Sequence, residues 1–117
     1  VLAARVDVQL AAVQSTWFRR FIMYDPARDI AAITCPVLAL FGSLDMQVPP
    51  DQNRPALESV VASARKANIT IRTIPGANHL FQEAKTGAPT EYATLPKAFI
   101  AGLPSVISTW MSHIALH

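Results

Sequence analysis

Asp45 and His79 are the two residues of this chain whose types and positions could do acid–base chemistry. Asp45 lies in the segment GSLDMQVP directly after the apolar run 37–41, and His79 lies in PGANH after the β-branched run 69–74. A carboxylate that hydrogen-bonds one imidazole nitrogen fixes the tautomer and stabilises the cation formed when the other nitrogen takes a proton. The sequence therefore predicts an acid–histidine pair if the fold brings these segments together. Each residue alone would also suit an ordinary turn or loop.

The elements that must position this pair alternate between helix and strand. The apolar run 37–41 shows no polar alternation, which is typical of a strand covered on both faces in a parallel sheet. A helical pattern follows Pro49-Pro50-Asp51, and the run 69–74 predicts a second strand. Pro104 suits the first turn of a last helix. Its inward stripe consists of Leu103, Val106, Ile107, Trp110 and Ile114.

Two strands joined by a helix form a right-handed crossover when they run parallel. Functional groups in such folds sit beyond the carboxyl ends of the strands. Asp45 and His79 each follow a strand, so we expect both at the same edge of the sheet. Residues 75–99 are expected to form a loop with only short helical patches.

The N-terminal segment 1–26 carries an apolar stripe at helical spacing. Ser15 suits an N-cap for a second helical segment, and Pro26 ends the pattern. Stripes of this kind usually pack into a core, which is the role that we expect here. The stripe consists of Val6, Leu10, Val13, Trp17, Phe21 and Tyr24.

Composition limits the possible classes of function. The 117 residues are enough for one domain, and 51% hydrophobic with 15% charged residues indicates a globular chain. The net charge of +2 and the scattered Lys and Arg argue against a nucleic-acid or membrane-surface partner. No apolar stretch reaches the roughly 18 residues of a membrane span, and no signal peptide is recognisable. A single cysteine, Cys35, fits a reducing compartment, and we expect a cytoplasmic protein.

Two long segments of the sequence resemble the C-terminal part of an α/β-hydrolase. They are DPARDIAAITCPVLALFGSLDMQVPPDQN and IPGANHLFQEAKTGAPTEYATLP, in which the motifs CPVL, GxxD, VP and GxNH carry the resemblance. The chain is similar to bacterial serine hydrolases related to dienelactone hydrolase and to prolyl-oligopeptidase-type peptidases, from about Trp17 through the last helix. The resemblance implies one α/β domain over 1–117, a partial three-layer segment with parallel strands. Residues 1–26 would match a cap-like helical segment, and residues 34–117 would carry the acid and the histidine.

The resemblance also implies roles for particular residues. Triad members in that family follow the order nucleophile, acid, histidine. Asp45 matches the acid and His79 the general base of ester or peptide hydrolysis by nucleophilic acyl transfer. Met46, Val48 and Gln82 are expected to line a substrate site.

The nucleophile of such a triad is missing from the sequence. The family places it in a Gly-x-Ser-x-Gly turn, but no two of the glycines here flank a serine. Ser43 follows Gly42, yet Phe41 and Asp45 stand where that turn needs small residues. Cys35 precedes the first predicted strand and is expected at the opposite end of the sheet. We therefore expect the chain to be incomplete or inactive by itself. The glycines are Gly42, Gly76, Gly87 and Gly102.

Two interpretations of this gap remain open. The chain starts at Val1 and not at Met, so it could be a fragment whose N-terminal hydrolase half is supplied elsewhere. It could instead be a free-standing, non-catalytic module that binds a partner or pairs with itself as a homodimer, because strand 37–41 would otherwise leave one edge unpaired.

Metal and phosphate sites are weaker alternatives. A metal site made of Asp45, His79 and His113 would lack the tight spacing that metal ligands usually show. No glycine-rich turn follows either predicted strand to hold a phosphate. We expect no metal and no other cofactor.

Overall fold

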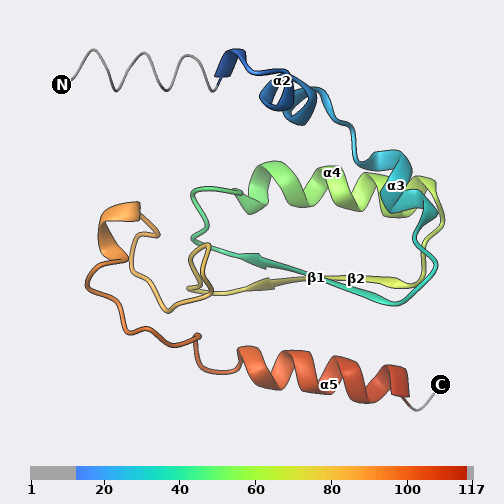
Figure 1. The fold of residues 1–117 in the computed structure, drawn as a ribbon. Helices are drawn as coiled ribbons and strands as arrows, with labels where there is room; N and C mark the ends of the chain where they lie inside the picture. Colours follow the sequence, from blue (N-terminus) through green and yellow to red (C-terminus); the bar gives the residue numbers. More distant parts are fainter. Residues whose placement is uncertain (1–12, 116–117) are drawn as a thin grey trace.

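The computed structural model describes residues 13–115 (Figure 1). Helices and strands alternate in the order that the sequence predicts, and the loop after the second strand contains only one short 3-10 helix. Val6 and Leu10 of the N-terminal stripe lie outside the described residues. The elements are α2 (Thr16–Met23), α3 (Ala27–Ala32), β1 (Val37–Gly42), α4 (Pro50–Ser63), β2 (Ile69–Ile74), η1 (Pro89–Glu91) and α5 (Leu103–Ala115).

Strands β1 and β2 form a parallel pair. The register runs from Val37 opposite Ile69 to Gly42 opposite Ile74, so the two strands end side by side. The strand positions and the parallel direction agree with the prediction. The protein is thus a small α/β fold with a two-stranded sheet.

Helices cover the two faces of this sheet (Figure 1). On one face, Arg54 Nη1 of α4 donates a hydrogen bond of 2.8 Å to Thr73 Oγ1. On the other, Trp110 Nε1 of α5 donates to Thr70 Oγ1 over 3.3 Å. Because side chains alternate along a strand, residues 70 and 73 of β2 point to opposite faces. The layers are therefore α4, sheet and α5.

The densest packing lies near the carboxyl ends of the strands. Ile74, Ala77 and Leu103 are buried there, and partly buried apolar side chains pack against them. Further along, α5 stands off from the sheet and leaves a groove of about 1160 Å³. The core thus supports the loops that follow the strands more firmly than it supports the rest of α5. The partly buried members of the core are Leu40, Phe81, Ile100 and Val106.

Helix α2 lies outside the α4 layer (Figure 1). Its N-cap is Ser15, whose Oγ accepts a hydrogen bond of 3.1 Å from Phe18 N, as the sequence predicted. The expectation that the aromatic stripe packs into the core is wrong for its described members, because Trp17 and Phe21 are 70% and 63% exposed. Their rings stack on each other at a centroid distance of 5.5 Å, and no other described element covers them.

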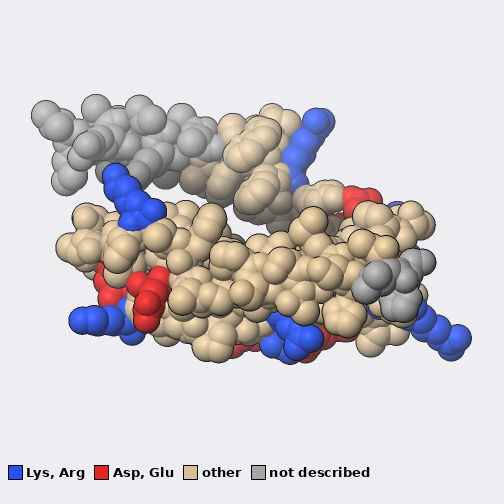
Figure 2. Space-filling model, turned by 90° about the horizontal axis from the view of Figure 1, so that it is seen from below, with Lys and Arg blue, Asp and Glu red and all other residues tan. Residues whose placement is uncertain are grey.

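Charged side chains form separate groups on the surface. On the face seen in Figure 2, the described Lys and Arg residues form separate small groups, several of them beside Asp or Glu, and no continuous basic patch. This agrees with the scatter of basic residues along the sequence. None of the helices within residues 13–115 is long and apolar enough to span a membrane.

Candidate functional site

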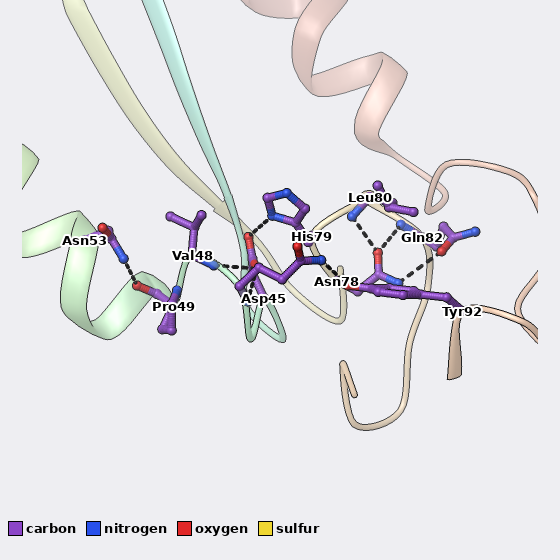
Figure 3. Close-up of polar contacts among 10 residues, drawn as sticks. Asp45, Val48, Pro49, Asn53, Asn78, His79, Leu80, Gln82 and Tyr92 are labelled. Carbon is purple, nitrogen blue, oxygen red and sulfur yellow. Dashed lines mark hydrogen bonds and ion pairs between the residues drawn. The ribbon is translucent and has the colours of Figure 1, made fainter. Parts of the chain in front are cut away.

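Asp45 and His79 meet at the carboxyl ends of the strands (Figure 3). His79 Nδ1 lies 2.9 Å from Asp45 Oδ2, a hydrogen-bonding distance. The parallel crossover produces this contact, since each residue sits in the loop that leaves one of two paired strands. The contact that the sequence predicted is therefore present, and the catalytic role of the two residues stays a prediction.

The loop after β1 holds the Asp45 carboxylate in a fixed orientation. Its Oδ1 accepts hydrogen bonds from the backbone N–H groups of Gln47 and Val48, at 2.8 and 2.9 Å. The backbone N–H of Asp45 in turn donates to Gly42 O over 3.1 Å. One carboxylate oxygen is thus held by the main chain, and the other is left to face His79.

These contacts decide the charge of the pair. Burial by itself would raise the pKa of Asp45, but the hydrogen bonds from Val48, His79 and Gln47 outweigh burial and hold that pKa below its ordinary value of 3.8. At neutral pH the carboxylate is ionised and can only accept hydrogen bonds. The proton of their shared hydrogen bond must then sit on His79 Nδ1.

The Asp45 side chain is mostly buried, whereas the His79 ring is accessible from the surface. The Asp45 side chain is 9% exposed and that of His79 is 38% exposed. His79 Nε2 has no hydrogen-bond partner among residues 13–115. In the neutral imidazole this nitrogen carries a lone pair that can accept a proton from a group arriving at the surface.

Backbone hydrogen bonds join the acid loop to the histidine loop. Ser43 N donates to Ile74 O over 3.0 Å, and Leu44 N donates to Ala77 O over 2.9 Å. Gly76 N donates to Ser43 Oγ over 2.8 Å. The distance between Asp45 and His79 is therefore set by main-chain contacts on both sides of the pair.

Gly42 makes this close approach possible. A Cβ atom at Gly42 would lie 2.5 Å from Ala77 O and 2.6 Å from Asn78 O, far inside normal contact distance. The glycine of the GxxD motif thus has a steric role, since the histidine loop passes directly over it. Its place in the sequence, at the end of a strand and three residues before the acid, is the signal for that role.

Two of the three residues predicted to line a substrate site lie at the surface beside the pair. Met46 and Val48 are exposed. Gln82 is placed differently: it is 8% exposed, and its Nε2 donates to Pro96 O over 3.1 Å. Its Oε1 accepts from Asn78 Nδ2, also over 3.1 Å. Its amide serves the interior of the histidine loop and does not face an open site.

Sequence reasoning did not single out the contacts that the later loop makes with the acid loop. Tyr92 OH accepts a hydrogen bond of 3.2 Å from Gln47 Nε2, across 45 positions of sequence. Gly87, at φ +75°, lies so close to Leu44 O that no Cβ would fit. The only signal in the sequence was a threonine–glycine pair before a proline-rich stretch, which predicts a turn but not its partner.

Glu91 stabilises this later loop. Its carboxylate accepts hydrogen bonds from the backbone N–H groups of Thr86 and Gly87, the latter at 2.9 Å. Desolvation opposes the charge, but these bonds prevail and hold the pKa of Glu91 below its usual value. The ionised glutamate keeps Gly87 against the acid loop at neutral pH.

The alternative reactive residues lie elsewhere. Cys35 is exposed just before β1, at the end of the sheet opposite to the pair. His113 lines the groove between α5 and the sheet and does not join Asp45 and His79. No group of three potential metal ligands occurs within the described part of the chain. No serine or cysteine among the described residues is hydrogen-bonded to His79.

Comparison with known proteins adds no assignment. No family model, no curated protein and no solved structure matched the chain. The geometry of the site itself is therefore the main basis for a function.

Proposed function

We propose that this chain is the acid–histidine part of a serine hydrolase of the α/β-hydrolase type, acting on esters or peptides. The observation that carries the proposal is the 2.9 Å contact between His79 Nδ1 and Asp45 Oδ2 beyond the carboxyl ends of a parallel sheet. The order of acid before histidine and the segments around both residues agree with that family.

The pair would act as an oriented general base. Asp45 keeps one proton on His79 Nδ1, so His79 Nε2 is free to accept another. Nε2 takes the proton of the attacking hydroxyl group while the oxygen of that hydroxyl group forms a bond to the acyl carbon of the substrate. The positive charge formed on the ring is stabilised by the carboxylate. Nε2 then gives the proton to the leaving group as the bond to the acyl carbon breaks.

The nucleophile would come from a segment that adds to the free edge of β1. β1 pairs with β2 along one edge, and its other edge has no partner among residues 13–115. The strand VLALFG carries no charge and no proline, the features that normally protect an exposed edge. We propose that the missing hydrolase half, either upstream in the same protein or on another chain, pairs there.

The test is a longer protein that includes the sequence encoded upstream of Val1. We expect this protein to hydrolyse p-nitrophenyl acetate and His79→Ala to abolish the activity, because the other triad members act only with their base. Asn68→Ala, at the opposite end of the sheet, is the control and should keep the activity. If the longer protein hydrolyses the ester equally well with His79→Ala, the assignment is wrong.

A second candidate function is a non-catalytic module that associates with itself. The exposed aromatic side of α2, with Trp17 and Phe21, and the free edge of β1 favour it. This candidate predicts no ester turnover and a dimer in sedimentation analysis. A monomer at all concentrations would contradict it.

We also propose a cytoplasmic location for either candidate, because the single cysteine, Cys35, is free.

A further inference from the structure

The residue that precedes His79 is the most deeply buried polar side chain of the described structure. Asn78 is 0% exposed and is the largest fully buried side chain among residues 13–115. A buried carboxamide without partners would be strongly unfavourable, so its hydrogen bonds must be strong enough to offset desolvation. Its position next to the exposed imidazole raises the question of what those bonds hold in place.

The Asn78 carboxamide ties together the residues on the far side of His79. Its Oδ1 accepts hydrogen bonds from Leu80 N at 2.9 Å and from Gln82 N at 3.0 Å. Its Nδ2 donates to Gln82 Oε1 at 3.1 Å. Figure 3 shows these bonds converging on the one side chain. The chain before and after His79 is thus connected through a single amide group.

The backbone of the same segment forms a tight turn. Phe81 N donates to Asn78 O over 3.0 Å, which makes His79 the second residue of a four-residue turn. Phe81 has φ of +54°, a conformation that residues with a Cβ rarely adopt. Such a conformation persists only when surrounding contacts hold it, and the Asn78 amide supplies three of them.

The turn is attached to the acid loop at its base. Ala77 O accepts from Leu44 N at 2.9 Å, and the backbone of residues 77 and 78 rests on Gly42. On the other side of the turn, Gln82 Nε2 donates a hydrogen bond of 3.1 Å to Pro96 O. Asn78 therefore lies between the anchored base of the loop and the imidazole that the loop presents.

We propose that Asn78 is a positioning residue for the Asp45–His79 pair: its buried carboxamide sets the turn that aims His79 Nδ1 at Asp45. This inference rests on the proposed function for its catalytic meaning, but it concerns the geometry of the pair in the chain as it stands. Asn78 touches no reacting atom and acts through His79.

The experiment reads the tautomer of His79 by 15N NMR in the unaltered chain and in variants, at a pH where the ring is neutral. We expect the unaltered chain to hold the proton on Nδ1. In Asn78→Ala, the Nδ1-protonated population should fall to that of the exposed His113 in the same spectrum, because the ring no longer faces Asp45. Asn68→Ala is the matched control, because it removes the same type of side chain, whose carboxamide donates to the backbone carbonyls of Ile33 and Cys35 at the opposite end of the sheet.

The same measurement on Asp45→Asn separates the possible outcomes. In Asp45→Asn the Nδ1-protonated form should also be lost; if it is not, the pair and the proposed function fail together. If Asp45→Asn loses it and a folded Asn78→Ala keeps it, the positioning role alone is overturned.

A measurement on the unaltered chain does not depend on how the variants fold. The amides of Leu80 and Gln82, which donate to Asn78 Oδ1, should exchange with deuterium at least tenfold more slowly than the amide of His79, which has no acceptor among the described residues. Equal exchange rates for these three amides would overturn the inference.

Discussion

Two regions of this molecule are built in different ways. At the carboxyl ends of β1 and β2, buried apolar residues and a dense hydrogen-bond network fix the Asp45–His79 pair. By contrast, α2 exposes stacked aromatic rings outside the α4 layer, and β1 has a free edge. The difference teaches that the geometry of the pair is specified by its own loops, whereas the apolar side of α2 and the edge of β1 have no partner among residues 13–115. The pair should therefore respond strongly to changes in its loops and weakly to changes in α2.

The largest effect should come from Gly42→Ala. The new Cβ would collide with the backbone of Ala77 and Asn78, which cannot move without opening the contact between the two loops. We expect a loss of roughly 3 kcal/mol in the free energy of unfolding, measured in urea. The control is Gly102→Ala, where a Cβ meets nothing within 4 Å and only the φ of +90° is unfavourable. That change should cost about 1–2 kcal/mol because of the positive φ. Equal losses for the two variants would contradict a specific steric role for Gly42.

An intermediate effect should follow from Asp45→Asn. The pKa of Asp45 lies below 3.8 in the folded chain, so the carboxylate stabilises the fold fully above the pKa of the unfolded chain. This stabilisation disappears as the pH falls through the lower, folded pKa. We expect the variant to lose roughly 1.5–3 kcal/mol at pH 7 and to show a smaller decline in stability than the unaltered chain as the pH falls below the ordinary pKa of 3.8. Urea titrations at several pH values measure the free energy of unfolding and its dependence on pH. If that dependence is the same in the variant as in the unaltered chain, Asp45 is not the group responsible for it.

The smallest effect on stability should come from the double change Trp17→Ser and Phe21→Ser. Both rings are mostly exposed and contact each other, so the free energy of unfolding should change by about 0.5 kcal/mol or less. The same variant should lower any self-association, which sedimentation at several concentrations measures. A large loss of stability would show that α2 packs into the core. It would contradict the proposed difference between α2 and the Asp45–His79 loops.

The sequence predicted the parts of the fold that show as regular hydrophobic patterns, and the residues that follow directly from them. Both strands, their parallel pairing and the meeting of Asp45 with His79 follow from apolar runs separated by one helical segment. The stripe on α2 was also visible, but a stripe tells which face is apolar and not whether another element covers it.

The irregular loops were much harder to predict. Gln82 was expected to line a substrate site, yet it is buried and its side-chain amide bonds to Asn78 and Pro96 inside the loop. The contact of Tyr92 with Gln47 spans 45 positions without any repeating pattern. Such contacts depend on the exact path of the loop, which short-range turn preferences do not determine.

The two carboxylate oxygens of Asp45 have different hydrogen-bond partners, and this has a consequence for the proposed proton transfer. Because two main-chain amides hold Oδ1, the carboxyl group cannot rotate away from the imidazole. In the proposed reaction, a proton that arrives at Nε2 would therefore meet a carboxylate whose orientation is already fixed by the fold. Little reorganisation energy would then be required from Asp45 in that step.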